Sequence, residues 1–293
     1  MSAPQLSRVA FQGERGAFSE EAAVRLLGEK IELAPRPTFE SLFSAIHEGA
    51  ADLILAPIEN TLAGSVHRSY DLLLESELTI IAEVVNPIVL CLIGPPGARM
   101  EDVRSVESHP VALAQCEHFF AGHPSIRRVV ADDTAGSVRN VVHSRDTSRA
   151  AIAGRRAAEV YGGVSLREHL EDDRANFTRF LLLSAAPKTP QGANKLSLVL
   201  RLAHRPGSLR AALEPFAIRG INLMRIESRP IPGQPWEYRF YLDLAASTED
   251  AEVRKALEEL RQLGNDVRVL GCYVAAEMPG KSEGAKNNAA KIA

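Results

Sequence analysis

The chain has 293 residues, and its 34 Lys and Arg against 37 Asp and Glu give a formal net charge of −3. A near-neutral chain with only 5% aromatic residues lacks the broad basic surface and the stacking rings that nucleic-acid binding needs. Three cysteines without a CxxC spacing disfavour a disulfide framework or a zinc site and favour a reducing, cytoplasmic compartment. No signal peptide is expected, and no apolar run reaches the ~18 residues that span a bilayer.

Short apolar runs alternate with amphipathic stretches over the first two thirds of the chain. The amphipathic stretches predict helices at Glu20–Leu27, capped by Ser19 and ended by Gly28, and at Phe39–His47, Val66–Leu74, Val111–Phe120 and Ala135–His143. The apolar runs predict strands at Arg8–Gln12, Asp52–Pro57, Leu78–Val85, Ile88–Ile93, Ile126–Val130, Ala150–Ala153 and Phe177–Ser184. This alternation predicts an α/β fold with a mainly parallel sheet and helices on both faces.

The pattern changes after a stretch rich in Pro, Gly and Asn, which predicts a linker at 187–194. The elements expected beyond it are strand Leu196–Leu202, helix Ser208–Arg219, strands Ile221–Ser228 and Glu237–Ala245, helix Glu249–Leu263 and strand Asp266–Ala275. Their order, βαββαβ, is the ferredoxin-like arrangement. Residues 276–293 carry no periodic apolar signal and are expected to form a disordered tail.

Polar segments at the predicted strand-to-helix junctions are the candidate site, because open α/β sheets bind their ligands there. The first, Gln12–Ser19, carries Gly13 and Gly16 ahead of a helix and is either a ligand loop or an ordinary tight turn. The second, Pro57–Val66, crowds polar side chains behind a buried strand, and these need either capping partners or a ligand.

Two further junctions carry candidate polar groups. Ser108-His109-Pro110 is followed by Gln115 within the next predicted helix, and Asp132–Gly136 is equally well interpreted as a helix cap or as a ligand contact. The eight histidines have no HExxH or other paired ligand spacing, which makes a metal site improbable. The chain also has no GxSxG nucleophile elbow.

The fifth segment, Asp172–Phe180, ends at the start of a predicted apolar strand. Thr178, Arg179 and Phe180 there supply a hydroxyl, a guanidinium and a ring at consecutive positions. Strand alternation places Thr178 and Phe180 on one face and Arg179 on the other, unless the strand end is irregular. Together with the other junctions, these groups suit the binding of a carboxylate and the steering of one proton.

In this order, and followed by a βαββαβ domain, the five segments resemble prephenate dehydratase. The matching stretches are GERGAFSE, PIENTLAGSV, SHPVALAQC, DDTAGSV and NFTRFLLL, and the resemblance runs from about Arg8 to about Tyr273. The last third resembles an ACT domain through RPGSLRAAL (205–213) and IESRP (226–230), the second being the family's phenylalanine-responsive motif. Because no chorismate mutase segment precedes Arg8, the resemblance is to the monofunctional form.

The resemblance implies a two-lobed catalytic domain of the periplasmic-binding-protein-like type II fold at residues 6–186. Lobe one would comprise 6–84 and 177–186, lobe two 85–176, and the ACT domain 195–275. The implied reaction converts prephenate to phenylpyruvate with loss of carbon dioxide and water, in phenylalanine biosynthesis. Aromatisation of the ring drives this reaction, so no metal, nicotinamide or pyridoxal cofactor is expected.

The same resemblance implies roles for individual residues. Thr178 would assist departure of the hydroxyl, Arg179 would anchor a substrate carboxylate, and Phe180 would place apolar surface near the ring carboxylate. Glu59 is expected to have a structural or proton-relay role. Residues expected to contact or orient the substrate are Gly16, Ala17, Ser19, Glu59, Asn60, Thr61, Ser108, His109, Gln115, Thr134 and Asn176.

Regulation is also implied, with phenylalanine bound between ACT domains of a homodimer or homotetramer. The expected effector residues are Gly207, Ser208, Leu209, Asn222, Leu223, Glu227, Ser228, Arg229 and Pro230. Ser208 stands where the family usually has alanine, a difference that can retune effector affinity. Two alternatives remain: arogenate dehydratase, which performs the same chemistry on an aminated substrate, and a non-catalytic amino-acid sensor. The Thr-Arg-Phe run and the missing signal peptide argue against the sensor.

Overall fold

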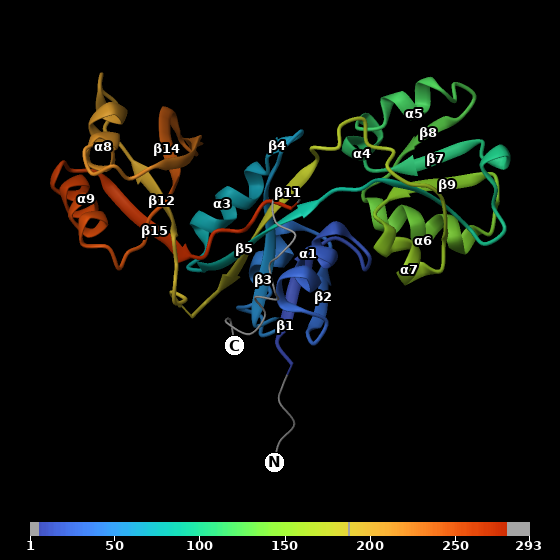
Figure 1. Cartoon of the computed structure of the whole chain (residues 1–293), viewed down its shortest axis with the longest axis horizontal. Coiled ribbons are helices and arrows are strands. Elements are labelled where there is room, and N and C mark those ends of the chain that lie inside the picture. Colours follow the sequence, from blue (N-terminus) through green and yellow to red (C-terminus); the bar gives the residue numbers. More distant parts are fainter. Residues whose placement is uncertain (1–5, 187, 280–293) are drawn as a thin grey trace, which may run out of the picture. The chain divides into compact units, whose positions relative to one another are not determined.

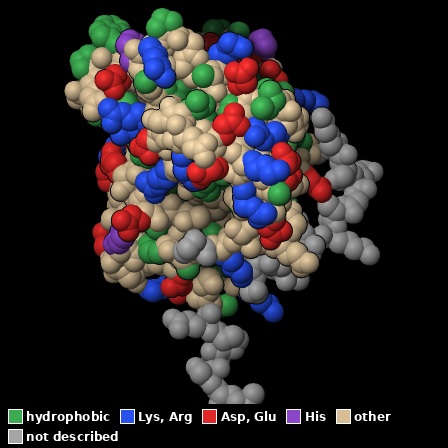
Figure 2. All heavy atoms as spheres, turned by 90° about the vertical axis from the view of Figure 1, so that its left-hand side faces the viewer, with side chains coloured by type: hydrophobic (Ala, Val, Ile, Leu, Met, Phe, Trp, Pro, Cys, Tyr) green, Lys and Arg blue, Asp and Glu red, His purple; other side chains and the backbone are tan. Residues whose placement is uncertain are grey.

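The computed structural model describes residues 6–186 and 188–279 (Figure 1). These residues divide into two compact units, each of which is described by itself. Unit 1 holds residues 6–76, 84–182 and 277–279, and unit 2 holds residues 77–83, 183–186 and 188–276. Within the described residues, no helix is long and apolar enough to cross a membrane. Basic and acidic side chains are intermixed on the face drawn in Figure 2.

The first sheet has the strand order β2-β1-β3-β11-β5, with the short β4 paired to β3. Strands β2 and β3 both pair with β1 in parallel, and β4 pairs with β3 in antiparallel fashion. Its strands are β1 (Arg8–Gln12), β2 (Glu32–Arg36), β3 (Leu53–Asn60), β4 (Gly64–Ser65), β5 (Thr79–Pro87) and β11 (Phe177–Ser184), and its helices are α1 (Phe18–Leu27), α2 (Phe39–Ser44) and α3 (His67–Glu75). Strand β11 arrives from far along the chain and lies beside β3, which brings two of the polar junctions together.

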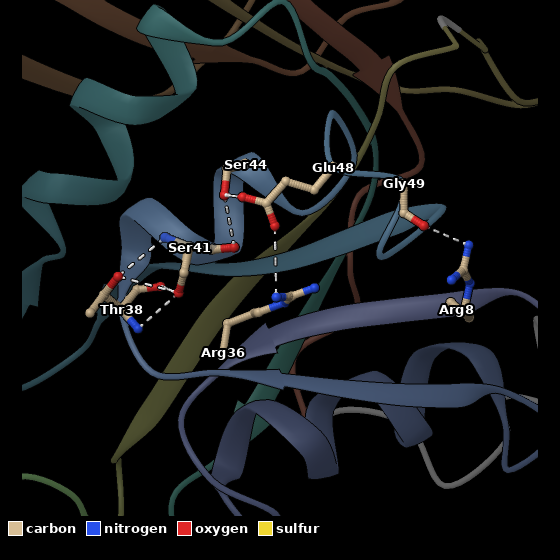
Figure 3. Close-up of polar contacts among 7 residues, drawn as sticks. All are labelled: Arg8, Arg36, Thr38, Ser41, Ser44, Glu48 and Gly49. Atoms are coloured by element: carbon tan, nitrogen blue, oxygen red, sulfur yellow. Dashed lines mark hydrogen bonds and ion pairs between the residues drawn. The ribbon is translucent and has the colours of Figure 1, made fainter.

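Helices α1 and α2, which pack against this sheet, begin in different ways. Helix α1 begins after Ala17, so the predicted cap, Ser19, is instead a buried residue of the first turn. Helix α2 begins at a capping box in which Thr38 and Ser41 exchange side-chain and backbone hydrogen bonds (Figure 3). Arg36 and Glu48 add a 3.9 Å ion pair beside it.

The second sheet of unit 1 has the order β10-β6-β9-β7-β8. The pairs β7–β8 and β7–β9 are parallel, whereas β6–β9 and β10–β6 are antiparallel, so the sheet is mixed rather than mainly parallel. Its strands are β6 (Cys91–Gly94), β7 (Ser105–Ser108), β8 (Arg127–Val130), β9 (Arg149–Ala153) and β10 (Val164–Arg167), and its helices are η1 (Met100–Asp102), α4 (Pro110–Ala114), α5 (Glu117–Ala121), α6 (Thr134–Ser144) and α7 (Arg155–Tyr161). We call the parts of unit 1 built around the first and second sheets lobe one and lobe two, and the chain passes between them after β5 and before β11 (Figure 1).

One predicted helix is split in lobe two. Residues 111–120 were expected to form a single helix, but α4 ends at Ala114 and α5 begins at Glu117. The break places Gln115 at the end of α4, where its backbone carbonyl accepts a hydrogen bond from the Asp172 amide at 2.8 Å. The Asp172 carboxylate in turn accepts from the backbone N–H groups of residues 117 and 118, so it caps α5 in place of a side chain within that helix.

Unit 2 contains a four-stranded antiparallel sheet of order β13-β14-β12-β15, which confirms the βαββαβ arrangement. Its elements are β12 (Lys195–Arg201), α8 (Ser208–Ala217), β13 (Leu223–Ile231), β14 (Gln234–Leu244), α9 (Ala251–Gln262) and β15 (Asp266–Tyr273). Leu198, Phe216, Leu242 and Leu257 belong to one buried cluster formed by the sheet and both helices. Of the tail expected at 276–293, residues 280–293 lie outside the described residues.

A buried ion pair ties the first half of β5 to this domain. Lys195 Nζ lies 2.9 and 3.0 Å from the two carboxylate oxygens of Glu83, and the two side chains are only 8% and 2% exposed. The backbone N–H of Ala276 donates to the same carboxylate at 2.9 Å. Burial of both charges is tolerated here because each is paired and the carboxylate receives a further hydrogen bond.

Candidate active site

The side-chain amide of Asn60 is the centre of the polar contacts at the end of β3. Its Nδ2 has two protons and lies within hydrogen-bonding distance of three acceptors, so one proton is shared: Asn176 Oδ1 is at 2.8 Å, the Phe177 carbonyl at 3.1 Å and Thr178 Oγ1 at 3.0 Å. Its Oδ1 accepts from the backbone N–H groups two and three residues further along the chain, at 3.0 and 2.8 Å. The amide is therefore held in one orientation, with its donor end facing the start of β11.

Thr178 receives that hydrogen bond on its oxygen, which leaves its own proton available to donate elsewhere. Thr178 and Arg179 are both half-buried. Both faces of the strand are therefore partly exposed to solvent at its start. Phe180 is different, because its side chain is only 2% exposed and lies in the core. An apolar contribution of Phe180 to a ligand site would therefore act from beneath the surface.

Thr61 fastens the loop after β3 to the chain entering β11. Its hydroxyl donates to the Ala175 carbonyl at 2.6 Å and accepts from the Phe177 N–H at 2.9 Å, while its own N–H donates to the Phe177 carbonyl at 2.9 Å. These contacts account for the hydroxyl within the protein. Glu59, on β3 and two residues before Thr61, is half-buried and lies opposite Ser65 in the β3–β4 pair.

A line of side-chain amides continues from Asn60 into lobe two. Asn176, only 1% exposed, donates from Nδ2 to Gln115 Oε1 at 2.9 Å, while its Oδ1 accepts from Asn60. Gln115, Asn176, Asn60 and Thr178 thus form one chain of hydrogen bonds that spans both lobes. Polar groups buried in such a chain fix one another's orientation, because an unpaired buried amide is costly.

The loop before α1 lies elsewhere and contacts lobe two. Gly16 has φ +81°, and a Cβ at this position would lie 2.7 Å from the Cα of Ala157. Its N–H donates to Glu20 Oε2 at 3.1 Å, so this donor is taken by a carboxylate of the chain itself. Ala17 and Ser19 are also buried. The first junction thus joins two parts of the protein, and its predicted contact with substrate stays a prediction.

Glu20 is the most deeply buried charge of this region, with a side chain fully enclosed. Arg15 Nε lies 2.7 Å from one carboxylate oxygen, and Arg156 Nε lies 2.7 Å from the other. Burial by itself raises the pKa of Glu20, but the hydrogen bonds from Arg15, Arg156 and the Gly16 N–H outweigh it, so the pKa lies below its ordinary value. Sequence reasoning did not single out Arg156, although it follows a Gly at a strand-to-helix junction.

The third junction supplies structural contacts in lobe two. Ser108 is fully buried and donates its hydroxyl to the Ile152 carbonyl at 2.6 Å, which links β7 to β9. His109 occupies the N-cap of α4, where its Nδ1 accepts from the Val111 N–H at 3.3 Å. Substrate contact by Ser108 would require that hydrogen bond to be exchanged.

The fourth junction contains a helix cap. The Asp133 carboxylate accepts from the N–H groups of Ala135 and Gly136 at 2.7 and 3.1 Å, as an N-cap side chain does. Burial raises the pKa of Asp133, and these backbone hydrogen bonds only partly oppose it. Thr134, the first residue of α6, is half-buried.

The expected effector residues fall on two elements of unit 2. Gly207, with φ +82°, precedes α8, and Ser208 and Leu209 open that helix. A pocket of about 140 Å³ lies here, lined among others by His204, Arg205, Ser208, Leu209, Glu237 and Tyr238. Sequence reasoning missed the β14 side of this pocket. The remaining expected residues lie before or along β13, an edge strand of the sheet: Asn222, Leu223, Glu227, Ser228, Arg229 and Pro230.

Comparison with known proteins identifies this arrangement. The family model for prephenate dehydratase matches residues 9–188, which include all five junctions, and the ACT domain model matches residues 197–262. The chain belongs to the prephenate dehydratase family. The prephenate dehydratase match runs through both lobes of unit 1, and the ACT domain match lies in the βαββαβ fold of unit 2. No group of His, Cys, Asp and Glu among the described residues could hold a metal ion.

Relatives named as dehydratases resemble the chain over most of its length. An arogenate dehydratase/prephenate dehydratase of Arabidopsis thaliana is 40% identical over 282 residues, which cover 91% of this chain and 71% of the relative. The crystal structure of a prephenate dehydratase from Arthrobacter aurescens, in complex with L-Phe, is 31% identical with a TM-score of 0.84, covering 92% of this chain and 90% of that one. A solved structure described as GqqA, a quorum-quenching acylase, is 34% identical with a TM-score of 0.84, covering 92% and 98%.

Proposed function

We propose that the chain converts prephenate to phenylpyruvate, as the name of its family indicates. The observation that carries this proposal is the hydrogen bond from Asn60 to Thr178, because it leaves the threonine hydroxyl as a proton donor at the start of β11. Membership of the family supplies the substrate class. The measurement that tests the proposal is the formation of phenylpyruvate from prephenate by the purified protein.

The reaction needs one proton and no redox partner. Breaking the bond between the ring and its carboxylate releases carbon dioxide, and the electron pair of that bond enters the ring as the C–O bond to the ring hydroxyl breaks. The departing oxygen takes up a proton and leaves as water, and the ring becomes aromatic. Because hydroxide is a poor leaving group, a positioned donor at its oxygen lowers the barrier.

In this reaction we assign the donor position to Thr178. A threonine hydroxyl is a weak acid, so it acts by hydrogen bonding to the leaving oxygen or by relaying a proton, and does not itself remain ionised. Asn60 supports this role by donating to Oγ1, which both orients the hydroxyl and increases its strength as a donor. Arg179 is assigned to a substrate carboxylate, for which the planar guanidinium provides paired donors.

Arogenate is the second substrate to be tested, because the name of the Arabidopsis relative contains both dehydratases. The two substrates differ only in a keto or amino group on the side chain, remote from the bonds that break. We assign prephenate as the preferred substrate, and the ratio of kcat/KM for the two substrates decides it. A preference for arogenate would overturn this assignment, and inactivity on both would favour the sensor alternative.

The acylase name of one structural neighbour is not carried to this chain. An acyl-transferring hydroxyl needs a base that withdraws its proton. The contact found on Thr178 Oγ1 is instead a hydrogen bond donated by the Asn60 amide, whose nitrogen is no base and cannot take the threonine proton. We therefore expect cleavage of N-acyl substrates to be absent under conditions in which prephenate is consumed.

We further propose that phenylalanine binds the ACT domain and controls activity in a homodimer or homotetramer. Three observations support this: the pocket beside Ser208, the position of β13 at the edge of its sheet, and the L-Phe bound to the Arthrobacter relative. Phenylalanine is expected to change both the rate and the sedimentation coefficient, and constancy of both would contradict the proposal. A cytoplasmic location is proposed on the three cysteines, all free and buried.

A further inference from the structure

The loop before α1 was expected to be either a ligand loop or a tight turn, and its Gly16, Glu14 and Ala17 contact lobe two. We propose that Glu20 and Arg156 are positioning residues that hold lobe one and lobe two in the alignment required for catalysis. This inference rests on the proposed function for its kinetic test. It assigns the GERGAFSE segment a role in aligning the lobes rather than in contacting the substrate.

An apolar core lies beneath this contact. Phe11 from β1 and Ala17 from the loop are buried in the same cluster as residues of β6, β9, α6 and α7. Phe11 is completely enclosed although it comes from lobe one. The hydrophobic core of lobe two therefore continues into lobe one at this place.

Close backbone approach accounts for two glycines of the contact. A Cβ on Gly16 would meet the backbone of Ala157 in α7, and a Cβ on Gly154 would lie 2.9 Å from the ring of Phe18. Each glycine thus lets a residue of the opposite lobe approach closer than a side chain would allow. These two points fix the distance between α1 and α7.

Ion pairs between the lobes then fix the orientation of lobe one relative to lobe two. The enclosed carboxylate of Glu20 is shared between Arg15 and the Gly16 N–H of its own lobe and Arg156 of the other lobe. A second ion pair, between Glu14 and Arg139 at 2.9 Å, joins the same two lobes but is about 40% exposed. Because the Glu20 pair is buried, it is far less screened by solvent than the Glu14 pair.

Alignment of the lobes matters because the hydrogen-bond chain at the site spans them. Gln115 of lobe two holds Asn176, which holds Asn60 and, through it, Thr178. If only a fraction of molecules have the lobes aligned, the apparent affinity for substrate falls by that fraction, while saturating substrate restores the full rate. Loss of the positioning pair should therefore raise KM and leave kcat unchanged.

The test compares neighbouring arginines on α7. Arg156→Gln removes the buried ion pair between the lobes, whereas Arg155→Gln removes an ion pair to Glu168 that lies within lobe two. We expect Arg156→Gln and Glu20→Gln each to raise KM for prephenate about tenfold with kcat within about twofold, and Arg155→Gln to leave both unchanged. Arg156→Lys keeps the charge and should recover most of the affinity.

Outcomes that contradict the proposal are distinct. A fall in kcat at constant KM, matched by loss of folded protein, would show a merely structural role and overturn it, as would an unchanged KM in Arg156→Gln. Hydrogen exchange gives a readout that is independent of the reaction: in Arg156→Gln the amides of residues 13–20 and of α7 should exchange faster, with β11 unchanged. Wild-type protein that is inactive on prephenate would refute the proposed function, whereas unchanged exchange at these amides would refute the positioning role.

Discussion

Asn60 Nδ2 donates to Thr178 Oγ1 across 3.0 Å, and this bond determines how the threonine hydroxyl can be used. An amide nitrogen can only donate, so the threonine oxygen accepts and its proton points away from Asn60. The two residues are 118 positions apart in the chain and meet because β11 lies beside β3. The fold thereby turns an ordinary hydroxyl into an oriented donor.

Asn60→Asp tests the direction of this hydrogen bond with almost no change in shape. The carboxylate keeps the oxygen that accepts from the backbone N–H groups of residues 62 and 63, but it cannot donate to Thr178. The threonine proton would turn toward the carboxylate and be lost to the substrate. We expect kcat to fall about 100-fold or more, within the range that a positioned proton donor contributes.

Thr61→Val is a suitable control in the same loop. It removes a hydroxyl that donates to the Ala175 carbonyl and accepts from the Phe177 N–H, so it should affect stability more than turnover. A folded Asn60→Asp protein with kcat close to that of the wild type would contradict the assigned direction.

The buried pair of Lys195 and Glu83 should be strongly asymmetric in its response to mutation. Lys195→Met leaves an enclosed carboxylate without its cation and should lower the free energy of unfolding by about 3–5 kcal/mol. Lys195→Met combined with Glu83→Leu removes both charges and should recover most of this loss. Urea unfolding measures both, and Arg210→Gln, which breaks an exposed pair with Glu214, should leave the midpoint unchanged.

Gly16→Ala and Gly28→Ala separate backbone strain from steric contact. Gly16 and Gly28 have φ values of +81° and +80°, but only Gly16 has a neighbour within reach of a new Cβ. Gly28→Ala should therefore cost about 1 kcal/mol through its positive φ alone. Gly16→Ala should cost about 1–3 kcal/mol more, because α7 must move. Equal unfolding midpoints for the two variants would contradict the close approach of the two lobes.

Alkaline pH should destabilise the protein through two buried thiols. Burial raises the pKa of Cys91 to about 11 and that of Cys116 to about 12, from the ordinary value of 9.0. Below pH 9 both thiols are neutral in the folded and unfolded states, so the native state bears no penalty. Between pH 9 and the raised values only the unfolded state ionises, and each thiol costs up to about 1.4 kcal/mol per pH unit.

Unfolding measured from pH 7 to 10.5 checks this dependence. The slope above pH 9 should be shallower in Cys116→Ala than in the wild type, whatever the effect of the substitution at pH 7. Parallel slopes for the two proteins would show that Cys116 is not the group responsible.

The order of helices and strands could be predicted wherever the spacing of apolar residues follows a single helical or strand pattern. β11 was predicted with its observed bounds because it contains the apolar run Phe180–Leu183, and βαββαβ was predicted because amphipathic helices and strands alternate clearly. The helix expected at 111–120 was wrong, because its cap, Asp172, comes from a distant segment. The helix propensity of residues 111–120 gives no information about a capping residue so far along the chain.

The candidate site was predictable in its residue types but not in its grouping. Asn60, Gln115, Asn176 and Thr178 were all expected to orient substrate or to act on it, and the structure brings them into one hydrogen-bond chain. Gly16 was grouped with them because the resemblance to the family implied it. Its N–H donates to the carboxylate of Glu20, four residues along the chain, and its actual neighbour is α7, a long-range contact that one sequence cannot reveal.

The measurement that tests the central claim most directly is phenylpyruvate formation from prephenate by the wild type, Thr178→Ala and Thr178→Ser. The proposed donor role predicts a robust wild-type rate, a fall of about 100-fold or more in folded Thr178→Ala, and substantial retention in Thr178→Ser, which keeps the hydroxyl. A folded Thr178→Ala protein within a few-fold of the wild-type kcat would contradict the role assigned to Thr178.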